Sequence, residues 1–186
     1  MTTIRSAIPL WQNQKITIHT DGSCLGNPGQ GGWAYVLRVY SGDTLKMQIT
    51  RAEHVPDTTN NQVEVMAAIN AFDICPPDVP IELFTDSTYV SDGCMKHRIT
   101  QKANGWRKSN NKPVANKKSW IKLDGLLNEK THKVIWVQAH VGNEFNEIAD
   151  GLARSAAEGF STDEIVYFDD EGNPISTPAT SQDKQD

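Results

Sequence analysis

Alternating apolar and polar positions mark the first regular structure in the chain. Residues 15–21 place Ile16 and Ile18 on one side and polar residues on the other, with the two-residue period of a half-buried β-strand. Two further segments, 31–40 and 44–55, are rich in aromatic and β-branched residues and are separated by a Ser-Gly-Asp turn. Three strands with short connections predict an antiparallel meander.

The pattern then changes to a helical period. Residues 59–75 bring Val65, Ile69 and Phe72 onto one helical face, and two prolines end this segment. Further segments of helical character are residues 88–96, 119–130 and 143–159. Short apolar segments, typical of strands covered on both faces, are residues 81–87 and 133–140. This order predicts an α/β fold: a five-stranded mixed sheet, with three antiparallel strands and then parallel crossovers, flanked by helices.

The net charge of −5 hides two segments of opposite sign. Residues 161–186 carry seven acids and one lysine, so the rest of the chain is +1. Residues 96–118 carry eight Lys and Arg and no acid, which is typical of a phosphate-contacting arm, although a solvated basic loop has the same composition. We therefore expect an N-terminal extension (1–14), one domain (15–160) with a basic protrusion at 96–118, and an acidic tail (161–186) disordered from about residue 176.

Hydropathy and cysteine usage indicate the compartment. The sequence has no apolar run of about 18 residues, and its first 14 residues lack the apolar stretch of a signal peptide. The cysteines Cys24, Cys75 and Cys94 show no paired spacing, which favours free thiols in a reducing compartment. We expect a cytoplasmic monomer with no membrane partner.

Four carboxylates stand where a ligand site would form. Asp21 and Asp86 each stand at the end of a predicted strand, and open α/β sheets collect ligands at strand ends. Glu64 and Asp150 share helix faces with alanines, which implies close packing on the sheet. Any one of the four could be a turn, cap or surface residue. Together they would repel one another unless a cation compensates, and Mg²⁺ is the usual hard cation held by few carboxylates.

A glycine-rich segment at 22–32 follows Asp21 and could be a phosphate loop, a metal site or a hairpin. It lacks the Gly-Lys-Ser/Thr of a P-loop and leads into a strand rather than a helix. We interpret it as a hairpin whose bare backbone lets a sugar-phosphate approach. His140 ends an apolar strand before a polar loop, so it could transfer a proton beside a metal or be an ordinary loop histidine.

Four stretches, in this order, carry a family resemblance: TDGSCLGNPGQGGWA, TTNNQVEVMAAI, TDSTYV and AHVGNEFNEIADGLA. Over roughly residues 15–160 the chain resembles type 1 ribonuclease H of the bacterial kind. The resemblance implies a ribonuclease H-like fold and endonucleolytic hydrolysis of the RNA strand in RNA–DNA hybrids, largely independent of sequence. It also implies two Mg²⁺ ions per site with substrate bound, which Mn²⁺ can replace.

The resemblance also assigns site residues by motif match. It implies that metal ions are held by Asp21, Glu64, Asp86 and Asp150, and that His140 assists the chemistry. The implied substrate contacts are Gly22, Ser23, Cys24, Asn27, Thr59, Asn60, Asn61, Ser87, Trp106, Lys112 and Asn116. His97 and Gln101 depart from the family, which often has tryptophans on this part of the protrusion, and they bear on substrate affinity.

Two other functions compete with this interpretation. A hybrid-binding module without catalysis would not need four carboxylates, and the TNNQVE helix start and basic protrusion disfavour a nuclease or integrase that acts on DNA alone. The acidic tail also has two interpretations. Either its acids compete with phosphate for the protrusion, or Ile165–Phe168 dock on the core and the remainder adds solubility.

Overall fold

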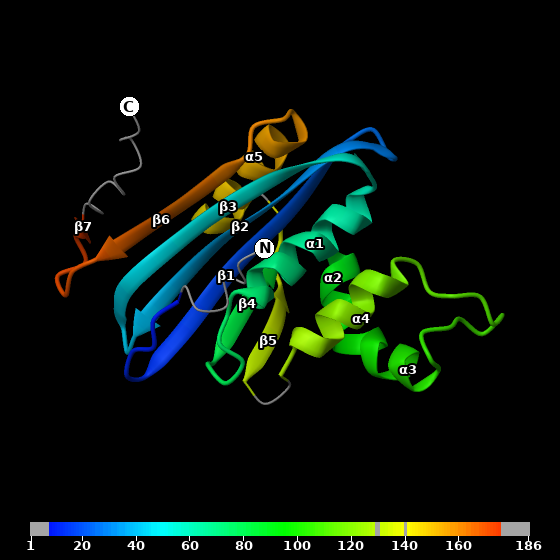
Figure 1. Cartoon of the computed structure of the whole chain (residues 1–186), viewed down its shortest axis with the longest axis horizontal. Helices are drawn as coiled ribbons and strands as arrows, with labels where there is room; N and C mark the ends of the chain where they lie inside the picture. Colours follow the sequence, from blue (N-terminus) through cyan, green and yellow to red (C-terminus); the bar gives the residue numbers. More distant parts are fainter. Residues whose placement is uncertain (1–7, 129–130, 140, 176–186) are drawn as a thin grey trace, which may run out of the picture.

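The computed structural model describes residues 8–128, 131–139 and 141–175 of the 186-residue chain. Its centre is one sheet with the strand order β5-β4-β1-β2-β3-β6-β7 (Figure 1). Three long antiparallel strands come first: β1 (Gln14–Leu25), β2 (Gly29–Ser41) and β3 (Thr44–Thr58). Two short strands extend the sheet in parallel with β1: β4 (Ile81–Thr85) and β5 (His132–Trp136). The predicted mixed α/β fold is confirmed.

Helices cover both faces of the sheet (Figure 1). On one face α1 (Asn60–Asp73) packs on β1 and β2, and α4 (Lys117–Leu126) packs on α1. On the other face α5 (Glu144–Ala157) packs on β1, β2 and β3. Among the described residues, no helix combines the length and the apolar character that a membrane crossing requires.

The helix predicted at 88–96 is longer in the structure. It consists of α2 (Thr88–Asp92), a π-helical turn η2 (Gly93–His97) and α3 (Arg98–Ala103), which lead into the basic protrusion. From the sequence, Gly93 weakens a helix prediction. In the structure this glycine makes room for an indole, because a Cβ there would lie 2.0 Å from Cη2 of Trp120.

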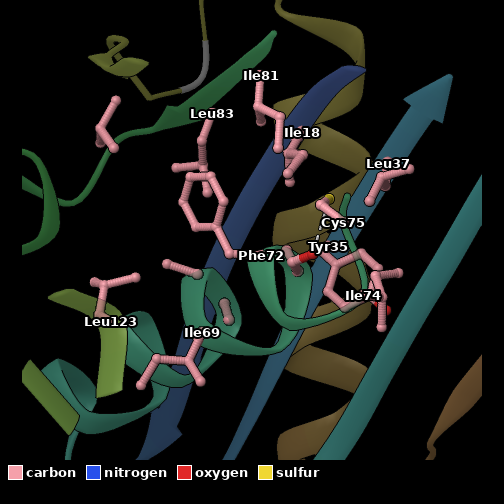
Figure 2. Close-up of a cluster of buried hydrophobic side chains, with 14 of the residues drawn as sticks. Ile18, Tyr35, Leu37, Ile69, Phe72, Ile74, Cys75, Ile81, Leu83 and Leu123 are labelled. Atoms are coloured by element: carbon pink, nitrogen blue, oxygen red, sulfur yellow. Dashed lines mark hydrogen bonds between the residues drawn. The ribbon is translucent and has the colours of Figure 1, made fainter. Parts of the chain in front are cut away.

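The main core lies between α1 and the sheet. Figure 2 shows Phe72 of α1 pointing toward Leu83 of β4, whereas Ile69 lies on the side of the helix nearer Leu123 of α4. These four side chains are at most 5% exposed. The helical period read from the sequence therefore marks the part of α1 that is buried between the sheet and α4.

A smaller core beneath α5 consists of alanines. Ala34 and Ala52 of the sheet meet Ala153 and Ala156 of the helix. A Cβ at Gly32 would lie 2.4 Å from the backbone nitrogen of Ala157, so only glycine allows this approach. Small residues thus bring α5, and with it Asp150, close to the sheet.

The two short parallel strands end earlier than predicted. β4 ends at Thr85 rather than at residue 87, because the chain turns there and the Ser87 hydroxyl accepts a hydrogen bond from the Val90 N–H at the start of α2. β5 lies at the edge of the sheet, and among the described residues β4 is the one strand beside it. The Val137 N–H still donates to the Thr85 carbonyl at 2.9 Å, but β4 turns away after Thr85, so β5 ends at Trp136 rather than at the predicted residue 140.

The sheet has seven strands instead of the expected five, because residues 162–175 join it. β6 (Thr162–Phe168) runs antiparallel along β3, and β7 (Pro174–Ile175) pairs with its end. Backbone pairing with β3 and the packing of Tyr167 against the main core account for this docking, whereas the side chain of Ile165 is exposed. The docking interpretation of this segment is thus supported; the predicted disorder from residue 176 falls outside the described residues.

The position of β6 and β7 contradicts competition between the acidic residues 169–171 and the protrusion. These strands form one edge of the sheet, and β5 forms the other. Figure 1 shows the turn between β6 and β7 on the far side of the molecule from α3 and the loop that follows it. Asp170 is paired with Lys46 on β3. We conclude that these acids do not lie against the basic residues.

Part of the predicted N-terminal extension is docked on the domain. Ile8 is buried in the main core, and Trp11 packs against it. The Ser41 hydroxyl donates to the Gln12 carbonyl at 2.8 Å, and the Gly42 N–H donates to the Asn13 carbonyl at 3.0 Å. Residues 8–13 therefore close the end of the sheet where β2 turns into β3.

Candidate active site

Asp21 and Asp86 meet because β1 and β4 run in parallel register. The last pair in that register is Thr20 with Thr85, so the two aspartates are the residues that directly follow a paired position, Asp21 within β1 and Asp86 just after the end of β4. β1 continues to Leu25, which means that Asp21 lies within its strand and not at the end as predicted. The turn of the predicted glycine-rich hairpin is therefore shorter than residues 22–32, because most of that segment belongs to strands β1 and β2.

Glu64 joins them because α1 packs directly on β1 at Gly22. A Cβ at Gly22 would lie 2.6 Å from the backbone nitrogen of Glu64 and 2.8 Å from the carbonyl carbon of Val63. With glycine in place, one carboxylate oxygen each of Asp21, Glu64 and Asp86 lies within 4.8 Å of the other two. The structure therefore brings three predicted metal ligands from three separate elements into one group, which we call the carboxylate cluster.

Burial makes the carboxylate cluster unfavourable without a cation. Burial raises the pKa of Asp21 to about 8, the charges of Asp86 and Asp150 add to the shift, and a hydrogen bond from the Gly22 N–H opposes it. Burial also raises the pKa of Glu64, and both aspartates add to that shift. Oε2 of Glu64 is buried and has no hydrogen-bond partner among the described residues. These oxygens fit a hard divalent cation, which would remove the repulsion.

Asp150, the fourth predicted ligand, lies at the margin of the carboxylate cluster. Arg154, one turn later on α5, donates from Nε to Oδ1 at 3.0 Å and from Nη2 to Oδ2 at 2.5 Å. The charge of Asp150 still raises the pKa of Asp21, so it acts on the cluster. The structure thus places this carboxylate beside the other three, in an ion pair.

Two residues that the sequence reasoning missed hold Asp86. Asn146 of α5 donates from Nδ2 to Oδ2 of Asp86 at 3.2 Å, and Trp136 of β5 donates from Nε1 to the backbone carbonyl of Asp86 at 3.1 Å. Asn146 stands four residues before Asp150, so helical spacing was a signal that both share one face. The predicted catalytic residue His140 lies outside the described residues.

Several predicted substrate contacts gather where the β1–β2 turn meets the start of α1. The Asn60 N–H donates to Oδ1 of Asn27 at 3.3 Å, and the Cys24 thiol donates to the Thr58 carbonyl at 3.5 Å. The Thr59 N–H donates to Oε1 of Gln62 at 3.0 Å, which fixes the first turn of the helix. The remaining predicted contacts on these elements are Gly22, Ser23 and Asn61.

A cleft of about 560 Å³ connects this region with the protrusion. Asn61 of α1 lines it together with His97, Gln101 and Lys108. The hydroxyl of Tyr89 at its wall accepts hydrogen bonds from Nδ2 of Asn116 at 3.1 Å and from Nε1 of Trp120 at 3.0 Å. The two departures from the family pattern, His97 and Gln101, therefore lie on the wall of one cleft.

Three other predicted substrate contacts, Trp106, Lys112 and Ser87, are fixed by hydrogen bonds within the protein. Trp106 has a positive φ of 59° and is 8% exposed, with its N–H donating to the Gln101 carbonyl at 2.7 Å. Lys112 is exposed, and its carbonyl accepts from the Lys108 N–H at 2.8 Å. Ser87 caps α2. Trp106 and Lys112 belong to the protrusion, apart from the carboxylate cluster.

Many basic groups of the protrusion already have partners within the protein. Arg98 and Lys102 both pair with Asp124 of α4, and Lys96 pairs with Asp92. Nη1 of Arg107 donates to the Asn111 carbonyl, and Nζ of Lys117 donates to the Gly105 carbonyl. Among the lysines of the protrusion (96–118), all of which the structure describes, the ammonium groups that form no ion pair or hydrogen bond are those of Lys108, Lys112 and Lys118.

The chain is similar in sequence and in fold to known ribonucleases H. The sequence model of the RNase H family matches residues 13–158. A ribonuclease H from Rhizobium etli is 42% identical over 153 residues, covering 82% of this chain and 98% of that protein. The solved structure of LC9-RNase H1, a type 1 RNase H with the type 2 active-site motif, has a TM-score of 0.71 at 24% identity and covers 88% of this chain and 82% of that one. LC11-RNase H1 in complex with an RNA/DNA hybrid has a TM-score of 0.55 at 21% identity and covers 77% of this chain and 96% of that one.

Proposed function

Because the chain belongs to the RNase H family, we propose that it is an endoribonuclease that hydrolyses the RNA strand of RNA–DNA hybrids. The observation that carries this proposal is the carboxylate cluster of Asp21, Glu64 and Asp86. The three side chains come from a strand, a helix and a loop, and they converge although their charges repel. Such a convergence is expected where cations and phosphate meet.

We infer that the carboxylate cluster holds two Mg²⁺ ions when substrate is bound, that Mn²⁺ can replace them, and that Asp150 is a further ligand. Held by Asp21, Glu64 and Asp86, such a pair of cations would supply activation of a water and stabilisation of the leaving oxygen in an in-line displacement. The protein supplies fixed oxygen ligands. Because Asp21 and Glu64 have raised pKa values without a cation, binding of the metal releases protons, so metal affinity increases with pH.

Recognition of the hybrid is proposed to extend from the carboxylate cluster to the protrusion. The hairpin backbone and the amides of Asn60 and Asn61 are the groups that would contact the RNA strand, whose 2′-hydroxyls distinguish RNA from DNA. The ammonium groups of Lys108, Lys112 and Lys118, which form no ion pair or hydrogen bond within the protein, are the ones proposed to contact phosphates. Phosphate and sugar carry no base code, so cleavage is expected at many sequences.

The rival functions differ in what they would require of the carboxylate cluster. A hybrid-binding module without catalysis gains nothing from bringing three mutually repelling carboxylates together and burying two of them, Asp21 and Glu64, which costs stability. A nuclease that acts on DNA alone would share the carboxylates, and substrate choice is what separates it from the proposed enzyme.

His140 remains the predicted proton-transfer residue.

The test is cleavage of labelled RNA–DNA hybrid, double-stranded RNA and double-stranded DNA in Mg²⁺. We expect cleavage of the RNA strand of the hybrid only, and loss of cleavage in Asp86→Asn. The matched control is Asp43→Asn, which also removes a carboxylate. Asp43 pairs with Lys15 and lies in the turn after β2, at the end of that strand far from the site. Cleavage of duplex DNA, or full activity of Asp86→Asn, would refute the assignment.

We also propose that the protein acts as a monomer in the cytoplasm. The three cysteines are free thiols, which agrees with a reducing compartment. Light scattering at micromolar concentration measures the oligomeric state, and a dimeric mass would contradict the proposal.

A further inference from the structure

Asn146 is a buried amide that contacts one side of the carboxylate cluster. It is 2% exposed, and its Nδ2 donates to Oδ2 of Asp86 at 3.2 Å. Its own Oδ1 is buried and has no hydrogen-bond partner within the described part of the chain. Buried amide oxygens are nearly always paired, so this one calls for a donor that arrives with a ligand.

The surroundings of Asp86 explain why an orienting group is needed. β4 ends one residue earlier, so Asp86 lies in a short loop before α2. Trp136 fixes the backbone of this loop through the Asp86 carbonyl, but it does not touch the carboxylate. Among the described residues, Asn146 is the side chain that donates a hydrogen bond to that carboxylate.

Helix α5 makes the position of Asn146 definite. The side chain of Asn143 caps the helix by accepting a hydrogen bond from the Asn146 N–H at 3.3 Å. Asn146 and Asp150 are one turn apart on the helix, so the same face presents an amide to Asp86 and a carboxylate to the neighbourhood of Asp21. The packing of Ala153 and Ala156 on the sheet fixes the depth of this face.

We propose that Asn146 is a positioning residue for the metal site. Its Nδ2 holds one oxygen of Asp86 and leaves the other for the cation. Its Oδ1 accepts a hydrogen bond from a water that the cation brings, since Mg²⁺ usually retains several waters. Hydrogen-bond partners of this kind orient the ligands of metal sites. The inference rests on the proposed function, because it requires a cation at the carboxylate cluster.

The test is calorimetric titration of the protein with Mg²⁺, and in parallel Mn²⁺, in the absence of nucleic acid. Asn146→Leu keeps the approximate volume and removes both polar groups, and we expect metal affinity to fall by about 10- to 100-fold. Asn146→Ser, a smaller polar side chain that cannot span the distance to Asp86, is the second variant, in case leucine prevents folding. The matched control is Asn143→Ala, which weakens the same helix start without touching Asp86.

The outcomes separate this inference from the proposed function. Weaker metal binding by the Asn146 variants, with parental affinity in Asn143→Ala, supports the positioning role. Affinity within twofold of the parent in a folded Asn146 variant overturns it and leaves the metal site intact. An equal loss in Asn143→Ala shows that helix stability is responsible and also overturns it. A parent protein that binds no Mg²⁺ refutes the metal site itself, and with it the role of Asn146.

Discussion

Replacing Gly22 with alanine tests how α1 sets the geometry of the carboxylate cluster. The added Cβ would lie 2.6 Å from the backbone nitrogen of Glu64 and 2.8 Å from the carbonyl carbon of Val63. Non-bonded heavy atoms prefer about 3.5–4.0 Å, so the helix must move away by roughly 1 Å. Both neighbours are backbone atoms of a packed helix, which cannot rotate aside as a side-chain end would.

Two losses follow from that displacement. Overpacking of this kind lowers the free energy of unfolding by about 1–3 kcal/mol. The same shift moves Glu64 relative to Asp21, and a misplacement of about 1 Å at a catalytic site can reduce the rate about 10²-fold. We therefore expect Gly22→Ala to remain largely folded and to cleave hybrid about a hundredfold more slowly.

Single-turnover cleavage at saturating hybrid and Mg²⁺ measures the rate, and urea unfolding measures the stability. The matched control is Gly125→Ala in α4, where no heavy atom lies within 4 Å of the added Cβ. That substitution should preserve the rate and raise stability by about 0.5–1 kcal/mol, as expected in a helix interior. A parental cleavage rate in Gly22→Ala would refute the reasoning, because α1 would then have moved without consequence.

The metal-free protein should lose stability as pH rises from about 4 to about 8. Burial raises the pKa of Asp21 from 3.8 to about 8, so over this range the folded state holds a proton on Asp21 that the unfolded state has lost. Urea unfolding in chelator should show a smaller pH dependence in Asp21→Asn, and an unchanged one would contradict the shift. Replacing Lys108 and Lys112 with alanine should reduce the slope of log affinity for hybrid against log salt concentration by about 1–2, because each phosphate contact contributes about 0.7–0.9 to that slope. An unchanged slope would show that other residues make these phosphate contacts. Neutralising residues 169–171 to Asn, Asn and Gln should leave hybrid affinity at low salt within about twofold of the parent, because the sheet lies between this turn and the protrusion. A tenfold gain in affinity would show that the acids reach the substrate.

The central carboxylates could be predicted because strand and helix patterns are local. Two apolar strands that each end near an aspartate, followed by parallel pairing, place Asp21 beside Asp86. The helical face that Glu64 shares with Ala68 and Ala71 likewise brings Glu64 to the sheet. Each of these inferences needs only periodicity and topology, and both can be read from short segments.

Other features depend on contacts that no short segment reveals. Asn146 has no distinguishing pattern, and its role appears only when α5 is docked on the sheet beside Asp86. The sequence indicated that Ile165–Phe168 could dock on the core, but not that residues 162–168 form a strand, because the pairing partner, β3, lies far away along the chain. The phosphate-binding role of the basic protrusion was predicted from its number of Lys and Arg residues. In the structure Asp124 of α4 pairs with Arg98 and Lys102, so these two cations are already neutralised within the protein.

The pairing of β6 with β3 has a consequence for how the protein folds. Residues from Met47 to Ala52 pair with residues from Thr162 to Tyr167, so more than a hundred residues of chain separate the partners. During synthesis the outer edge of β3 must stay open until β6 has left the ribosome, and an open strand edge is a template for pairing with other chains. Non-local strand pairing is also slow to form. Polypeptides halted before residue 162 should therefore aggregate more readily than chains that include β6, because β6 covers the outer edge of β3.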